Sequence, residues 1–420
     1  MTLSSWKKVE AEAERLRGKD LQTVANRNDL DAFIWAAPHL EADVGKQFID
    51  ESALAALQGL AQERGLEDKI RSLFAGEIVN VSEHRPALHW ALRGNGKGIP
   101  TAEAMAREAE KATAFAKKAA SGGLGFQLKA ILHIGIGGSD LGPRLIWDAL
   151  RDYTSGGPQI RFVANVDPED FAEQTAGLDA KTTLVLVVSK SFKTPETASN
   201  AQLGREWLVK QLGEAEANNH LAAVSSAPDK AKAWGAAEMD AHFRDTPLDS
   251  NVPAKLAMLD VFRHSAKDNA PTRTVLAYAH RLRKLPDFLQ QLEMESNGKN
   301  VSDAPGGLIT PTAPIVWGSV GTLGQHSFHQ LLHQGMRESS IEFVAALDAG
   351  AGDKARGRAL LSNAFAQAEG LLAGRSRDAA EKELLAKGMS AEKAKAQSVH
   401  MHMEGGRGST NRESTRLKEC

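Results

Sequence analysis

The stretch Ile131-Leu-His-Ile-Gly-Ile-Gly-Gly-Ser-Asp-Leu-Gly-Pro143 decides the fold of this chain. A short apolar run leads into glycines and then into a hydroxyl and a carboxylate, which predicts a strand, a tight turn and the start of a helix. Ser139 and Asp140 are residue types that favour a helix N-cap, while the glycines let the backbone turn sharply or lie against a ligand. The expected ligand of such a turn is an anion.

Further β-branched runs alternate with segments of helix length on the C-terminal side of this stretch. Four runs before residue 230 predict a parallel, doubly wound α/β sheet, and a second set after residue 270 predicts a second domain of the same kind. We expect a helical N-terminal region over 1–115 that packs on the second domain, a first α/β domain over 116–237 and a second over 238–420. The predicted strands are 130–136, 160–166, 183–188, 221–225, 272–279, 314–318 and 341–347.

The composition argues against nucleic-acid and membrane partners. The 420 residues include 51 Lys and Arg against 53 Asp and Glu, so the net charge of −2 predicts no basic surface, and any anion site must be local. The only cysteine is Cys420, which fits a reducing compartment, and the first residues contain no apolar signal segment. We therefore expect a cytoplasmic protein with a small-molecule substrate.

The glycine turn resembles the dinucleotide fingerprint G-x-G-x-x-G only in part. In the frame that starts at Gly135, Asp140 stands where the third glycine should be, and a carboxylate would repel a pyrophosphate. A smaller phosphorylated ligand held mainly by Gly138 and Ser139 is the favoured hypothesis. A dehydrogenase is disfavoured, and a turn of purely structural importance remains an alternative.

A second polar turn, Ser189-Lys-Ser-Phe-Lys-Thr-Pro-Glu-Thr197, follows directly on the predicted strand 183–188. Thr194 and Pro195 are an N-cap and a first helical residue, so hydroxyls gather beside free backbone N–H groups and Lys190. This predicts a phosphate cradle formed by Ser189, Lys190, Ser191 and Thr194. The spacing is not that of a Walker loop, and a connection without function is the alternative. Both turns follow strands of one sheet and can face one crevice.

A third candidate lies in Gln290-Gln-Leu-Glu-Met-Glu-Ser-Asn-Gly-Lys299. At α-helical spacing Glu295 shares an apolar inward stripe with Phe288 and Leu292, whereas Glu293 points elsewhere and Gln291 lies one turn before Glu295. Burial would raise the pKa of the Glu295 carboxyl toward the range of a base that takes a proton from carbon. A solvated glutamate at a helix end is the alternative.

Three histidines, His326, His329 and His333, are expected along one side of a single helix. The last two are spaced as in H-E-x-x-H, but Gln330 replaces the glutamate, so a metalloprotease is disfavoured and no metal is expected. His326 follows the glycines and can move a proton near neutral pH, and the other two are expected to be structural.

In combination these motifs closely resemble the glucose-6-phosphate isomerase family, and they occur in the same order. The resemblance rests on 134–143, 189–197, 294–299 and 324–328, and it extends from about Ala53 to about Arg407. It implies two doubly wound parallel-sheet sugar-isomerase (SIS) domains and a reaction without a cofactor, the interconversion of glucose 6-phosphate and fructose 6-phosphate. It also implies a homodimer, because in the family the histidine matched by His326 comes from the neighbouring subunit.

The resemblance assigns each candidate residue a role. Glu295 matches the carboxylate that takes the C2 proton and returns it at C1 through a cis-enediol, with Gln291 beside it, and His326 matches the histidine that assists ring opening. The remaining residues match the family's phosphate-holding and sugar-lining positions, which are Ser189, Lys190, Ser191 and Thr194 for the phosphate and Gly138 and Ser139 for the sugar.

The sequence departs from the family pattern in two places. Between Gly235 and Glu238 the family carries several tens of further residues, including an arginine that steadies the enediolate, so the first SIS domain is expected to lack its last strand. The family's later segment with a lysine that serves ring opening has no counterpart either, so the second SIS domain is expected to be incomplete at its C-terminal end. The alternative function is therefore a sugar-phosphate-binding homologue that is catalytically impaired or inactive.

Overall fold

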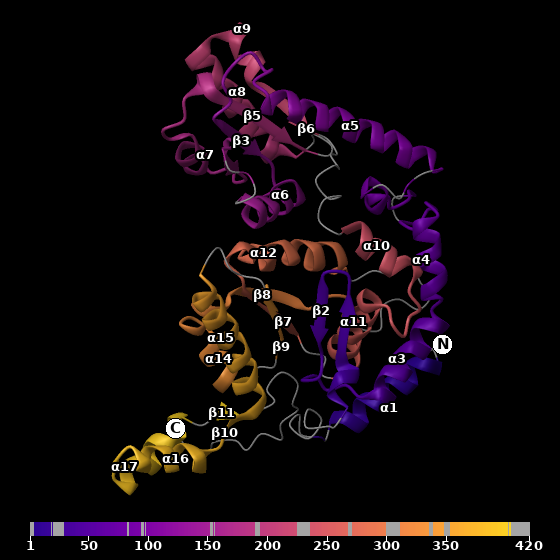
Figure 1. Cartoon of the computed structure of the whole chain (residues 1–420), viewed down its shortest axis with the longest axis vertical. Coiled ribbons are helices and arrows are strands. Elements are labelled where there is room, and N and C mark those ends of the chain that lie inside the picture. Colours follow the sequence, from indigo (N-terminus) through magenta and orange to yellow (C-terminus); the bar gives the residue numbers. More distant parts are fainter. Residues whose placement is uncertain are drawn as a thin grey trace. The chain divides into compact units, whose positions relative to one another are not determined.

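The computed structural model describes the chain in two compact units, unit 2 with residues Lys69–Arg244 and unit 1 with Met1–Asp68 and Asp245–Cys420 (Figure 1). The domain limits expected from the sequence stay predictions. No helix in the described ranges is long and apolar enough to cross a membrane. The described residues are 4–17, 19, 29–81, 84–93, 96, 98–151, 154, 156–189, 194–224, 236–267, 271–299, 311–335, 339–347, 353–401 and 403–404.

A parallel four-stranded sheet forms the centre of unit 2. Its strand order is β4-β3-β5-β6, and the register places Ile134 opposite both Val163 and Val187. The four strands predicted from the sequence are confirmed, each within three residues of its expected end. Of the described strands, β6 pairs only with β5. The strands are β3 (Ala130–Ile134), β4 (Gln159–Val163), β5 (Thr183–Val188) and β6 (Leu221–Val224).

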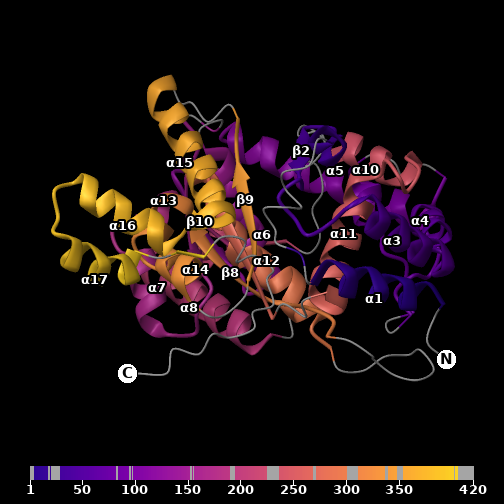
Figure 2. The ribbon, with the colours of Figure 1, turned by 90° about the horizontal axis from the view of Figure 1, so that it is seen from below.

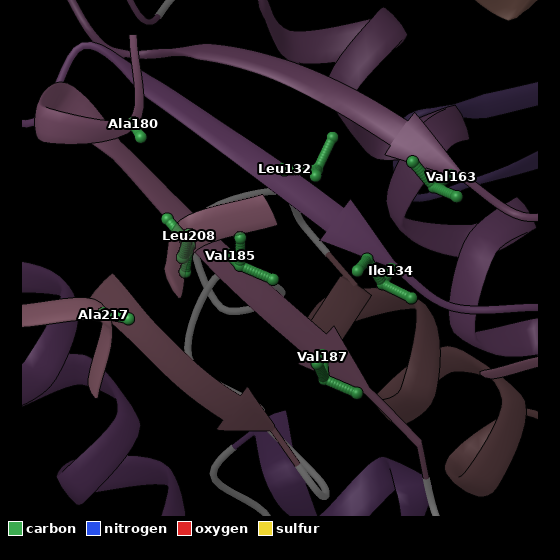
Figure 3. Packing of buried hydrophobic residues seen from close by; sticks show 8 residues of the cluster. All are labelled: Leu132, Ile134, Val163, Ala180, Val185, Val187, Leu208 and Ala217. Carbon is green, nitrogen blue, oxygen red and sulfur yellow. The ribbon is translucent and has the colours of Figure 1, made fainter. Parts of the chain in front are cut away.

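Apolar side chains of this sheet pack against helix α8 (Pro195–Leu212). Figure 3 shows Leu208 of α8 beside Val185 of β5, with Leu132 and Ile134 of β3 in the same cluster, and all four are buried. Strands whose apolar runs are covered by helices are what a parallel sheet requires, because its crossover helices pack on the faces of the sheet.

Close contact between α8 and the sheet depends on a glycine. A Cβ at Gly204 would lie 3.0 Å from Ile134 Cδ1 and 3.1 Å from Val185 Cγ1, so the helix lies nearer to the strands than a larger residue would allow.

The remaining helices of unit 2 surround the sheet or form a second cluster around Trp90, whose ring lies 4.9 Å from that of Phe74. Arg93 donates two hydrogen bonds to the Asp240 carboxylate and so ties this cluster to α10. Unit 2 begins within α4 and ends within α10. These helices are α4 (Leu66–Phe74), α5 (Pro100–Ala120), α6 (Gly138–Leu150), α7 (Pro168–Thr175), α9 (Glu214–Ala217) and α10 (Ala236–Asp245).

Unit 1 contains a parallel three-stranded sheet of order β8-β7-β9, as the second set of apolar runs predicted. Leu276 and Tyr278 of β7 pack with Leu332 of α14 and Leu371 of α15 in one buried cluster. Figure 2 shows α14 and α15 along this sheet. These elements are β7 (Thr272–Tyr278), β8 (Ile315–Val320), β9 (Ser340–Ala345), α12 (Leu285–Leu289), α13 (Gly321–Gln325), α14 (His329–Gln334) and α15 (Lys354–Ala373).

The first 68 residues complete unit 1. Helix α1 packs on α3, and Lys255 of α11 lies over the ring of Trp35, 4.0 Å from its centroid. Phe48 packs against Leu372, so the N-terminal segment also contacts α15. The remaining elements of unit 1 are α1 (Ser4–Arg17), β1 (Ile34–Ala37), β2 (Leu40–Asp43), α3 (Glu51–Glu63), α11 (Val252–Val261), β10 (Gly374–Arg375), α16 (Arg377–Ala386), α17 (Ala391–Met401) and β11 (Met403–Glu404).

The packing of α8 yields the first prediction. We expect Gly204→Leu to lower the free energy of unfolding by about 1–3 kcal/mol, because the new side chain must displace Ile134 and Val185. Gly59, in the middle of α3, is the matched control, since no atom lies within 4 Å of the position that its Cβ would take. Gly59→Leu should preserve or raise stability. Urea denaturation measures both variants, and equal effects would contradict the close packing of α8.

Candidate active site

The turn after β3 begins helix α6 earlier than the sequence predicted. The N-cap is Gly137, with φ 57° and ψ −126°, and the helix starts at Gly138. Ser139 and Asp140 are therefore the second and third helical residues, and their prediction as N-caps is wrong. The reason is the left-handed φ of Gly137, a conformation that glycine adopts at little cost and that turns the chain directly into the helix.

Asp140 is buried in this first helical turn, where Arg144 neutralises it. The guanidinium donates to both carboxylate oxygens, with Nη2 2.7 Å from Oδ1, and it also lies over the Phe162 ring, 4.7 Å from the centroid. A carboxylate in the first turn also interacts favourably with the helix dipole. The repulsion of a pyrophosphate inferred from Asp140 is thereby weakened, and the absent third glycine remains the argument against a dinucleotide.

Backbone amides are available at this turn. The N–H groups of Ser139 and Asp140 donate within the turn, to Ile136 O at 3.1 Å and Gly137 O at 3.0 Å. The N–H groups of Gly137 and Gly138 have no acceptor in the part of the chain that the structure describes. These two groups, together with the Ser139 hydroxyl, can donate hydrogen bonds to the oxygens of a ligand.

The second polar turn is described at its two ends. Ser189 is 5% exposed, and its N–H donates to Val224 O of β6 at 3.3 Å. Thr194 is the N-cap of α8 with Pro195 at the first helical position, as predicted, and its hydroxyl makes no capping bond. Lys190 and Ser191 lie outside the described residues.

The two turns follow neighbouring strands. Because β3 pairs directly with β5 in parallel, their carboxyl ends lie at the same edge of the sheet. Ser139 follows the end of β3 by five residues and Ser189 follows the end of β5 by one. The expectation that both turns lie at one edge is confirmed, and this edge is where ligands bind in open α/β sheets.

Glu295 lies in unit 1 at the end of a π-helical turn, Gln290–Glu295, that continues α12. Its side chain is exposed, so the prediction of a buried carboxyl on an apolar stripe is wrong, and Leu292 is 46% exposed as well. The physical reason is the turn itself. A π-helical turn takes in one more residue than an α-helical turn, so the α-helical spacing no longer places the side chains.

The structure nevertheless brings Gln291 and Glu295 together as predicted. Gln291 Nε2 donates to Glu295 Oε2 at 2.7 Å, and Lys299 Nζ donates to the Glu295 backbone carbonyl. Glu295 Oε1 has no partner among the described residues. A carboxylate held through one oxygen and open at the other is suited to accept a proton from a bound molecule.

Glu293 has a different environment. Its side chain is 26% exposed and Oε1 lies 3.8 Å from Arg273 Nη1, within a group that also includes Glu342 and Asp260. Arg273 and Glu342 lie toward the amino ends of β7 and β9. Glu293 is therefore a structural ion-pair residue, in agreement with its expected direction away from the site.

His326 is exposed and directly follows α13 as its C-cap. Tyr278, at the carboxyl end of β7, holds α13 at both ends. A Cβ at Gly321 would lie 2.1 Å from the Tyr278 ring, and Gln325 Nε2 donates to Tyr278 Oη at 2.9 Å. The last strand residue thus fixes the short helix that presents His326.

His329 and His333 do not share a helix with His326, and the expected single helix is wrong. The chain breaks at 326–328, and α14 starts at His329. Both histidines donate to Oε1 of Gln367 on α15, from His329 Nδ1 at 3.0 Å and from His333 Nε2 at 2.9 Å. Burial, and then the neighbouring His333, hold the pKa of His329 below its ordinary value. These two side chains are structural, as predicted.

Sequence reasoning missed Tyr278 and Gln367 because neither belongs to a motif. The one sequence signal that could have found Tyr278 is the spacing of Gly321 and Gln325, which lie one helical turn apart after a predicted strand and contact it together. No group of three or more His, Cys, Asp or Glu in the described ranges could hold a metal ion.

The candidate residues divide between the units: Gly138, Ser139, Ser189 and Thr194 lie in unit 2, and Gln291, Glu295 and His326 lie in unit 1.

Known proteins resemble the chain over most of its length. It is 39% identical over 441 aligned residues to the glucose-6-phosphate isomerase of Caulobacter sp. (strain K31), which covers 92% of this chain and 81% of that protein. It is 37% identical over 455 residues to the glucose-6-phosphate isomerase of Saccharophagus degradans, with 96% and 83% covered. The crystal structure of a glucose-6-phosphate isomerase from Chlamydia trachomatis superposes with a TM-score of 0.79 at 29% identity and covers 89% of this chain and 82% of that chain.

The model of the phosphoglucose isomerase family matches residues 43–236 and 233–415. The two matched segments meet where the sequence pattern indicated missing residues. The alignment with the Caulobacter protein also runs over more positions than this chain has residues, so that relative carries residues that are absent here. With family matches on both sides of this junction, two α/β sheets and relatives of this similarity, the chain belongs to the phosphoglucose isomerase family.

Proposed function

We propose that the chain is an aldose-ketose isomerase that interconverts glucose 6-phosphate and fructose 6-phosphate, acting as a cytoplasmic homodimer. The observation that carries the proposal is the Glu295 carboxylate, which Gln291 holds at 2.7 Å through one oxygen while the other has no described partner. The reaction needs one base that takes a proton from carbon and returns it to the neighbouring carbon, and such a carboxylate can do both. Family membership supports the choice of substrate.

In the proposed mechanism Ser189, Lys190, Ser191 and Thr194 hold the phosphate, and Gly138 and Ser139 contact the sugar. The hydroxyls and backbone N–H groups of these turns supply the hydrogen-bond donors that an anionic, polyhydroxylated ligand requires.

Glu295 carries out the proton transfer. In the open-chain aldose it removes the proton at C2, the electron pair forms the C1–C2 double bond of a cis-enediol, and the oxygen at C1 takes up a proton from solvent to become a hydroxyl. Return of the first proton to C1, with release of the hydroxyl proton at C2 to solvent, gives the ketose. His326 assists the preceding ring opening by proton transfer, which suits an exposed imidazole.

A homodimer is proposed because the resemblance places His326 at the site of the neighbouring subunit. Leu323 on α13 and Leu331 on α14 flank His326 in sequence, and they are 67% and 51% exposed. Both side chains are free to be covered by another subunit.

One observation favours the second candidate function, a sugar-phosphate-binding homologue with impaired catalysis. The family match is interrupted at 233–236, where the sequence pattern lacks the arginine that steadies the enediolate. Loss of one charge partner of a transition state commonly costs a factor of about 10²–10³ in turnover.

The direct test separates these two functions. We expect the purified chain to form fructose 6-phosphate from glucose 6-phosphate in a coupled assay and to bind 6-phosphogluconate in calorimetry. Binding without turnover would replace the isomerase by the impaired homologue. Absence of both would contradict a sugar-phosphate function altogether.

The role of Glu295 is tested by Glu295→Gln, which keeps the shape and removes the base. We expect kcat to fall about 10²–10⁴-fold, with binding of 6-phosphogluconate retained, in steady-state kinetics and calorimetry. Glu293→Gln is the matched control two residues away, and its turnover should remain close to that of the original protein because Glu293 faces Arg273. Unchanged turnover in Glu295→Gln would refute the assigned base.

The shared site is tested by combining two inactive subunits. If each site takes Glu295 from one subunit and His326 from the other, a mixed dimer of Glu295→Gln and His326→Ala subunits contains one complete site. Random co-assembly should then restore about a quarter of the sites. The measurement is the activity of the co-expressed pair against each variant alone. Recovery of no activity would contradict the exchange of His326 between subunits.

A further inference from the structure

Helix α6 contains a proline that deprives one backbone carbonyl of its helical donor. Pro143 lies inside the helix and has no N–H group. Four residues earlier, the carbonyl of Ser139 would ordinarily accept that hydrogen bond. Ser139 is also the residue proposed to contact the sugar.

A histidine from the preceding strand supplies the missing donor. His133 of β3 places Nε2 2.8 Å from the Ser139 carbonyl oxygen. A carbonyl oxygen can only accept, so Nε2 must carry the hydrogen, which fixes the tautomer of a neutral imidazole. The side chain is 5% exposed and packs on the Phe162 ring, 5.0 Å away between centroids. Burial holds the pKa of His133 below its ordinary value, and the nearby Asp140 and Arg144 act on it in opposite directions.

Gly135 provides the space for this contact. A Cβ at that position would lie 2.6 Å from the Ser139 carbonyl oxygen, too close for any residue except glycine. The carbonyl therefore projects back over the end of β3. His133 and Gly135 both contact this carbonyl, and Pro143 leaves it without its usual helical donor.

We propose that His133 is a positioning residue for sugar binding: through the Ser139 carbonyl it fixes the turn of Gly137, Gly138 and Ser139 that contacts the sugar. His133 itself does not touch the ligand. The peptide groups of this turn are continuous with the one that His133 holds, so loss of the bond removes the donor that His133 supplies and lets the turn reorient. This inference rests on the proposed function, since the sugar is the ligand assigned to the turn.

The test exploits the missing helical donor. His133→Leu removes the N–H and should raise KM for glucose 6-phosphate, or Kd for 6-phosphogluconate, about tenfold, with kcat changed much less. Pro143→Ala restores an N–H to residue 143, so the double variant His133→Leu/Pro143→Ala should recover to within about threefold of the original affinity. Pro143→Ala alone should bind normally. A double variant that binds no better than His133→Leu would overturn the proposal.

His220 is the matched control for the loss of a buried histidine. It is 1% exposed in the same unit, and its Nδ1 bonds a backbone carbonyl, that of Thr183, at 2.8 Å. Thr183 begins β5, so this bond lies at the edge of the sheet away from the two turns. His220→Leu should lower stability and leave KM and Kd unchanged. An equal rise in KM for both variants would show a general effect of destabilisation and refute positioning.

A measurement without ligand separates this inference from the proposed function. Nitrogen NMR of the full chain should show His133 as the neutral Nε2–H tautomer, and the amides of Ser139 and Asp140, which donate within the turn, should exchange faster with solvent in His133→Leu. An Nδ1–H tautomer of His133, or amide exchange rates that do not change in the variant, would overturn the proposed role of His133. If the original protein binds no sugar phosphate, the proposed function fails, and the assignment of a sugar to this turn fails with it. The tautomer of His133 and the amide exchange rates would still show whether His133 fixes the conformation of the turn.

Discussion

The parallel pairing of β3 with β5 is the constraint on which the positions of the two polar turns depend. Ile134 lies opposite Val187 in this pair, so both strands end at one edge of the sheet and the chain leaves each of them as a polar turn. The strands are held by apolar packing against α8, whose Gly204 allows the helix to lie close to both. Hydroxyl and amide groups separated by about fifty residues of sequence are thereby brought to one edge by buried apolar contacts.

Unit 1 also contains a parallel sheet covered by helices, and in it a single buried side chain holds the helix before His326. Tyr278 ends β7 completely buried, and its ring and hydroxyl both contact α13, so the rigid strand determines where His326 stands. In the same unit, Gln367 of α15 accepts hydrogen bonds from His329 and His333 of α14 and so joins the two helices. In unit 1 the exposed His326 therefore follows a short helix that the buried Tyr278 holds in place.

The sequence predicted the strands and the helix start at Thr194-Pro195 well because their signals are local. Apolar runs that end in glycine or hydroxyl residues indicate strand and turn whatever lies elsewhere, and Thr194-Pro195 marks a helix start by residue type alone. The direction of the Glu295 side chain could not be predicted, because a π-helical turn changes the number of residues per turn and no residue type in the sequence indicates such a turn. The break after Gln325 depends on Tyr278, a partner forty-seven residues away in the sequence. The helix start at Gly138 depends on the left-handed φ of Gly137.

Unit 1 is assembled from two segments of the chain, 1–68 and 245–420, whereas unit 2 is continuous from 69 to 244. This order has a consequence for biosynthesis. Domains fold as units while the ribosome releases the chain, so unit 2 can close before its neighbour is complete. Residues 1–68 leave the ribosome before unit 2, yet their partners, including Lys255 for Trp35 and Leu372 for Phe48, follow unit 2 in the chain. The segment ahead of unit 2 must therefore wait for the rest of its core until unit 2 has been synthesised.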